Sequence, residues 1–127
     1  MENKYKSVIE DAVAKLYEQY PELDEKYGEV GRKKCYEDNI HHFNYLESAS
    51  DVGESKVFSD YALWLNSVLV SRGMKSDHLI DNFKCIKESI KESDVDKGEE
   101  FKLYLNEAIE SIQAADSESE NMPFTKR

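Results

Sequence analysis

Apolar residues recur at steps of three and four in five separate stretches of this chain, and that spacing constrains its fold more than any other feature. Such steps place side chains on one face of an α-helix, whereas a half-buried strand needs strict alternation. Only five glycines and two prolines interrupt the 127 residues. The stretches predict helices at about 4–20, 32–49, 51–73, 76–90 and 99–114.

The third of these helices is the most apolar, and its apolar residues cover the wide arc of a central helix with several neighbours. Residues 22–31 are expected to form a connection with one helical turn before Gly28. We therefore predict an all-α fold, an antiparallel bundle of about five helices, with residues 1–114 as a single domain. The polar, aperiodic residues 115–127 predict a disordered acidic tail.

The net charge of -10 argues against nucleic-acid binding, which requires a concentrated basic patch. No segment resembles a targeting signal or approaches the roughly 20 apolar residues of a membrane span. We expect a cytoplasmic protein that binds neither nucleic acid nor membrane. Cys35 and Cys85 are expected to be free, packed thiols, because a cytoplasmic chain keeps its thiols reduced.

The segment CYEDNIHHFNYLESA, residues 35–49, contains the polar cluster on which any functional site would depend. His42 lies at the margin of the apolar face and His41 points elsewhere, so the two do not form a metal pair, and we predict no metal site. Asp38 precedes His42 by four residues, which lets the two side chains meet. The pair is either a surface salt bridge or an oriented histidine able to bind a cofactor. A pair also predicts a raised His42 pKa.

Catalytic motifs are absent: there is no phosphate-binding glycine loop, no nucleophile elbow and no CxxC. We therefore predict that the protein is not an enzyme and has no catalytic residue. Trp64 either packs in the core or, with Tyr61 and Phe58, lines a pocket for a flat ligand. The candidate cofactor-binding residues are His42, Asp38, Tyr61, Trp64 and Phe58.

Residues 20–91 resemble a helical module that lies upstream of vitamin B12-binding or signalling domains in bacterial regulatory proteins. The matching positions are Cys35, Asp38, His42, Phe43, Tyr45, Leu46, Phe58, Tyr61, Trp64, Arg72 and Gly73. No strand-helix alternation follows residue 91 and the Asp-x-His-x-x-Gly segment is missing, so cobalamin binding is not carried over. The resemblance implies a sensory or regulatory module that stands alone.

The main hypothesis is therefore a non-enzymatic sensory or regulatory module that acts through protein–protein interaction, with a small bound ligand as an option. One alternative is a haem- or tetrapyrrole-binding sensor with His42 as the ligand. A second is a small acid–base enzyme that uses Asp38 and His42. No cofactor is certain, and a tetrapyrrole is the one considered. Leu63 and Val70 lie outside the main apolar stripe of their helix, which favours a homodimer.

Overall fold

A computed structural model describes the backbone of residues 5–120 and the side chains of residues 5–116. Within that range the chain forms five helices and no strand, so the all-α prediction is confirmed. They are α1 (Lys6–Gln19), α2 (Pro21–Val52), α3 (Ser55–Ser71), α4 (Ser76–Glu92) and α5 (Gly98–Glu120). None of these helices is long and apolar enough to cross a lipid bilayer.

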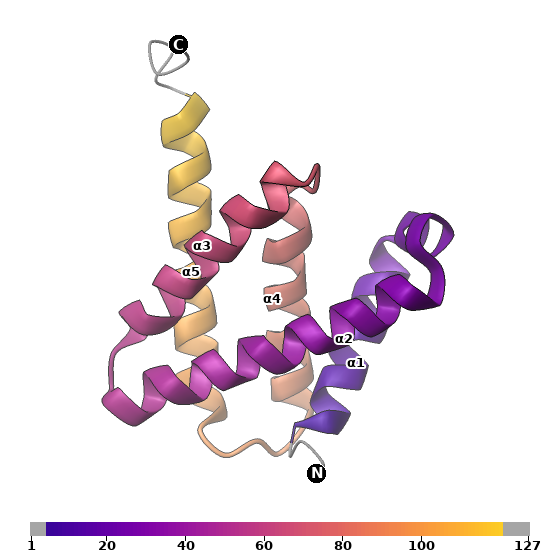
Figure 1. Cartoon of the computed structure of the whole chain (residues 1–127). Helices are drawn as coiled ribbons and strands as arrows, with labels where there is room; N and C mark the ends of the chain where they lie inside the picture. Colours follow the sequence, from indigo (N-terminus) through magenta and orange to yellow (C-terminus); the bar gives the residue numbers. More distant parts are fainter. Residues whose placement is uncertain (1–4, 121–127) are drawn as a thin grey trace.

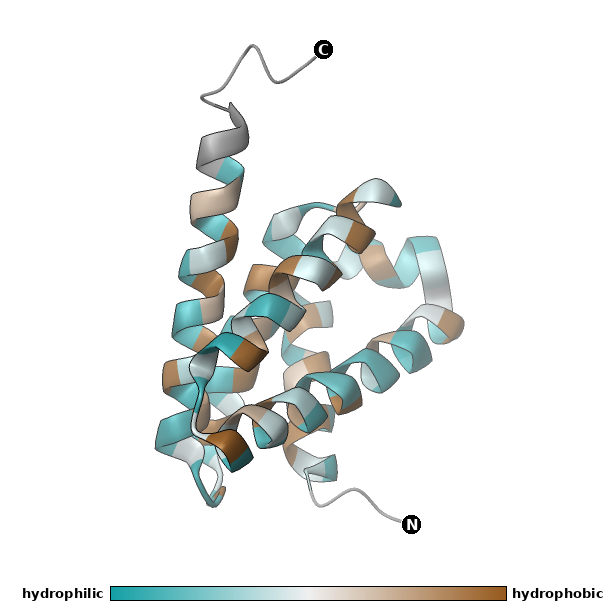
Figure 2. Ribbon diagram, turned by 60° about the vertical axis from the view of Figure 1, so that its left-hand side comes forward, coloured by the Kyte–Doolittle hydropathy of each residue, from teal (hydrophilic) through white to brown (hydrophobic). Residues whose placement is uncertain are grey.

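The helices are arranged in two directions. α4 and α5 run side by side, and α2 and α3 pass across them (Figure 1). α1 packs mainly against α4 and α2, while α3 packs mainly against α5. The apolar positions of each helix form a discontinuous band among polar ones (Figure 2), as the three- and four-residue spacing predicts.

A core of aromatic rings joins the four later helices. Each of these contributes one fully buried phenylalanine: Phe43, Phe58, Phe83 and Phe101. Tyr5, before α1, stacks on Phe43 with 4.5 Å between ring centroids. Each buried ring removes about 150–250 Å² of surface from water, so these contacts are a principal source of stability.

The α1–α2 junction differs from the expectation. Pro21 ends α1 as predicted, but it also begins α2, since a proline is tolerated in the first turn of a helix. The prediction of a connection at 22–31 is wrong, because this segment is helical on both sides of Gly28. Burial of Leu23 fixes the first part, and this single apolar anchor among charged residues is too short to show periodicity.

Gly28 breaks α2 with φ 61° and ψ -149°, a conformation that only glycine adopts readily. At the other end, α5 continues to Glu120, beyond the predicted end at residue 114. The part of the predicted tail at 121–127 lies outside the described residues. The division into one domain and a tail stays a prediction.

Replacing Gly28 with Ala should destabilise the fold through the backbone alone, because an added Cβ would meet no atom within 4 Å. We expect a loss toward the upper end of about 1–3 kcal/mol. Gly53→Ala is the matched control: its φ of 70° and ψ of 29° lie in the left-handed helical region, where alanine costs about 1 kcal/mol. Urea unfolding measures both, and equal losses would contradict the distinction.

Candidate functional site

His42 lies inside the bundle where α2, α3 and α4 meet. Its side chain is 1% exposed. Its Nδ1 atom is 2.7 Å from the hydroxyl oxygen of Tyr61 on α3, and its ring meets the Phe83 ring edge-on at 5.2 Å between centroids. His42 is therefore a core residue whose Nδ1 already has a hydrogen-bond partner.

Burial lowers the pKa of His42 to about 3, although a hydrogen bond with the Asn82 side chain opposes the shift. Asp38 makes no hydrogen bond or ion pair with it and pairs with Lys34, at 3.8 Å between Oδ1 and Nζ. Burial raises the Asp38 pKa, and the Lys34 charge opposes this. The prediction of a raised His42 pKa is thus wrong, because desolvation outweighs the charge of a carboxylate that does not contact the ring.

An amide pair joins α2 to α4 beside His42. Asn39 Nδ2 donates to Asn82 Oδ1 at 3.1 Å, and Asn82 Nδ2 donates back to Asn39 Oδ1 at 2.9 Å. Asn39 Nδ2 also donates to the carbonyl oxygen of Cys35 at 2.8 Å. Both side chains are buried and satisfied, so this pair fixes the register of α2 on α4.

The other candidate residues do not line a common pocket with His42. Phe58 is fully buried, and Tyr61 is mostly buried with the Tyr45 ring stacked on it at 4.0 Å between centroids. Trp64 is 61% exposed on the outer face of α3. The five predicted residues thus divide between the core and the surface. Within the described residues, no group of three or more His, Cys, Asp or Glu side chains could hold a metal ion.

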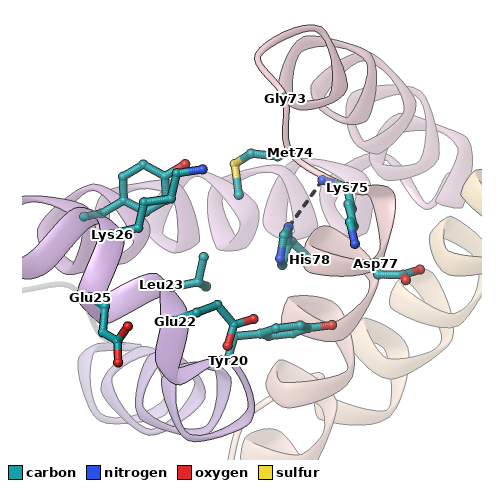
Figure 3. Close-up of a pocket in the computed structure, with 11 residues that line it drawn as sticks. Tyr20, Glu22, Leu23, Glu25, Lys26, Gly73, Met74, Lys75, Asp77 and His78 are labelled. Carbon is teal, nitrogen blue, oxygen red and sulfur yellow. Dashed lines mark hydrogen bonds between the residues drawn. The ribbon is translucent and has the colours of Figure 1, made fainter.

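A groove of about 640 Å³ lies elsewhere, between the start of α2, the α3–α4 turn and the start of α4 (Figure 3). Its lining residues are Tyr20, Glu22, Leu23, Glu25, Lys26, Tyr27, Gly73, Met74, Lys75, Asp77 and His78. We call it the Met74 groove. The His78 ring meets the Tyr20 ring edge-on, and His78 Nδ1 accepts a hydrogen bond from the backbone N–H of Lys75 at 3.3 Å.

Cys35 and Asp38 lie farther along α2 than the wall of the Met74 groove. Asp38 interacts electrostatically with Arg72, which directly precedes Gly73 in the groove wall. The Cys35 thiol is half-buried, and burial together with the Asp38 charge raises its pKa to about 12. Cys85 is buried, and burial raises its pKa to about 11. Both thiols are free, as predicted.

Sequence reasoning missed the groove. It is built from a segment expected to be a connection, from a turn, and from residues of the first turn of α4 such as His78. No spacing rule links these segments, because they meet only after α2 has folded across α4. The available signal was Pro21 followed by Leu23, a helix start with one apolar anchor.

The neutral, buried His42 should make the fold sensitive to acid. Its folded pKa lies below the unfolded value of about 6.5, so the unfolded chain binds the proton first as the pH falls. The free energy of unfolding is therefore highest above about pH 6.5. It falls as the pH drops toward the folded pKa, by at most about 1.4 kcal/mol per pH unit. Urea unfolding at about pH 7 and about pH 5 measures this loss.

His42→Gln should remove most of that loss, whereas His41→Gln, at an exposed neighbour, should retain it. If the wild type and His42→Gln lose the same free energy of unfolding between the two pH values, His42 is not neutral in the fold.

Comparison with known protein families matches residues 1–112 to the phycobilisome protein family. No curated protein and no solved structure matches the chain. The matched range includes every residue behind the resemblance to the module upstream of vitamin B12-binding or signalling domains, and it shows no link to such domains, so that resemblance is wrong. The sensory or regulatory function derived from it is wrong for the same reason. Because the match extends over most of the chain, this protein belongs to the phycobilisome protein family.

Proposed function

We propose that this protein carries a bilin, an open-chain tetrapyrrole, attached through Cys35. Proteins of the phycobilisome family carry covalently bound bilins for light harvesting. The observation that carries the proposal is a free, half-buried cysteine in a chain of this family that also has a groove of suitable size. This observation favours the alternative hypothesis of a tetrapyrrole-binding protein. The residue that holds the tetrapyrrole is then a cysteine and not His42.

The choice of Cys35 rests on access. The chain has two cysteines, and Cys85 is buried, at 6% exposure. Cys35 is half-buried and lies three residues before Asp38, whose carboxylate interacts with Arg72 at the edge of the Met74 groove. His42 supports no ligand role, because it is buried and its Nδ1 is bonded to Tyr61.

The Met74 groove has the size for a flat molecule, and its lining combines two lysines with three carboxylates, Glu22, Glu25 and Asp77. Its volume of about 640 Å³ lies within the roughly 300–1,000 Å³ of ligand pockets. Tyr20 and Tyr27 line the groove. Lys26 and Lys75 lie on opposite walls (Figure 3), where each would pair with one of the two propionate groups. Asp38, three residues after Cys35, would supply an acceptor for the pyrrole N–H groups of a bilin held there. The bilin itself supplies the absorption of visible light.

Attachment at Cys35 should be slow at neutral pH, because a thiol with a pKa of about 12 is almost entirely protonated and the thiolate is the nucleophile. The carboxylate of Asp38 adds to this effect by disfavouring a second negative charge. Deprotonation therefore requires a base, a higher pH or an opening that exposes the thiol to water.

We propose no catalytic activity for this protein, and neither a nucleic acid nor a membrane as its partner. Asp38 and His42 do not share a surface, so an acid–base enzyme has no support from their positions. Phycobilisome proteins assemble into oligomers with one another, and we propose that this chain self-associates as well. A cytoplasmic location is also proposed.

Covalent attachment is testable with an ethylidene-bearing bilin and purified protein at mildly alkaline pH. Intact mass after denaturation should rise by one bilin for the wild type and for Cys85→Ala, but not for Cys35→Ala. Asp38→Asn should retain the adduct and shift its visible absorbance, because the charge of the N–H acceptor is lost. An adduct on Cys35→Ala would contradict the assignment.

Occupation of the Met74 groove is tested separately, by visible circular dichroism of the bound bilin. Met74→Glu places a charge in the groove and should weaken binding about tenfold or more. Leu103→Glu, at the edge of a different hollow between α4 and α5, is the matched control and should bind like the wild type. Equal affinity for both variants would exclude this groove as the binding site.

A further inference from the structure

A second hollow, of about 840 Å³, lies between α4 and α5, and it contains neither Cys35 nor any residue of the Met74 groove. Its lining residues are Lys84, Lys87, Glu88, Lys91, Glu99, Lys102, Leu103 and Asn106. We call it the lysine groove. Its four lysines outnumber its two glutamates in a chain whose net charge is -10, so it is a local reversal of the molecule's charge.

The lysines are only partly neutralised from within the molecule. Lys102 pairs with Glu99 at 2.8 Å, and Lys87 donates to Asn106. Lys84 and Lys91 are exposed and make no ion pair or hydrogen bond with any described residue. These two lysines lie one helical turn to either side of Glu88. Because their charges are uncompensated, they favour binding to an acidic surface of another molecule.

An exposed carboxylate lies on the same face of α5. Continuing the line of Leu103 and Asn106 by four and then three residues reaches Glu110 and Gln113, both exposed. The sequence has no Lys or Arg from 103 to 125. The outward face of the α4–α5 pair thus carries the lysine groove before Asn106 and the Glu110 carboxylate, with no opposing cation among the described residues, beyond it.

We propose that this face binds the same face of a second copy, with the two α5 helices antiparallel about a two-fold axis near Asn106. Residues 103 and 110 lie three and four positions from Asn106, so each copy would present Glu110 to Leu103 and the lysine groove of its partner. A two-fold contact needs such a self-complementary surface. Leu103, 54% exposed, would supply the apolar contact that charges alone do not.

This inference deepens the proposed self-association and does not depend on a bound bilin. It also differs from an apolar dimer through α3, which the exposed Trp64 and Val70 would form. The two surfaces predict opposite salt responses. Contacts between exposed charges weaken as the Debye length shrinks, whereas burial of Trp64 would persist.

Light scattering across a concentration series gives the mass of the bilin-free chain in about 0.05 M and about 0.5 M salt. We expect a dimer in low salt whose dissociation constant rises about tenfold or more in high salt. Lys84→Glu with Lys91→Glu should abolish the dimer, and so should Glu110→Lys. Lys33→Glu with Lys56→Glu makes the same charge change at exposed lysines elsewhere and should retain it.

Mixing the Lys84→Glu/Lys91→Glu protein with the Glu110→Lys protein should restore a dimer, because the reversed groove then meets the reversed residue 110 while the native groove meets the native Glu110. This recovery also shows that both variants are folded. A wild-type chain that stays monomeric, a mixture that stays monomeric, or a dimer that Trp64→Ser abolishes while the lysine variant retains it would each overturn the proposal. None of these outcomes bears on bilin attachment, which is measured by mass and absorbance.

Discussion

The structure depends on one buried polar junction, at which side chains from α2, α3 and α4 satisfy one another. The reciprocal amide bonds of Asn39 and Asn82 join α2 to α4, and the bond between Tyr61 and His42 joins α3 to α2. Each of these groups is costly to bury alone, at about 1–3 kcal/mol for an unpaired donor or acceptor. The three helices can therefore pack only in the register that pairs them, which also fixes where Cys35 lies.

This junction explains which parts of the structure the sequence could predict. Apolar spacing was enough for the helices, because burial follows the helical period directly. The partner of His42 was not predictable, since Asp38 is four residues away in sequence and Tyr61 is nineteen. Local spacing favours the nearer partner, whereas the fold determines which side of α2 faces α3.

The candidate site was harder to predict from the sequence than the partner of His42. Cys35 and Asp38 stood out in the sequence because they share one short polar segment, but the Met74 groove is formed by other segments: the start of α2, the α3–α4 turn and the start of α4. Trp64 looked like a core residue by its helical position, yet it lies on the surface. Residues that meet through a turn and a helix crossing have no common period, so only the three-dimensional structure brings them together.

The break at Gly28 divides α2 into two helical segments. The later part, which carries Cys35, is clamped to α4 by the amide pair. The earlier part, which forms one wall of the Met74 groove, is joined to it through a residue with a non-helical backbone conformation. The proposed attachment point and one wall of the groove therefore lie on two separately anchored helical segments of α2, the earlier one held by the buried Leu23 and the later one by the amide pair.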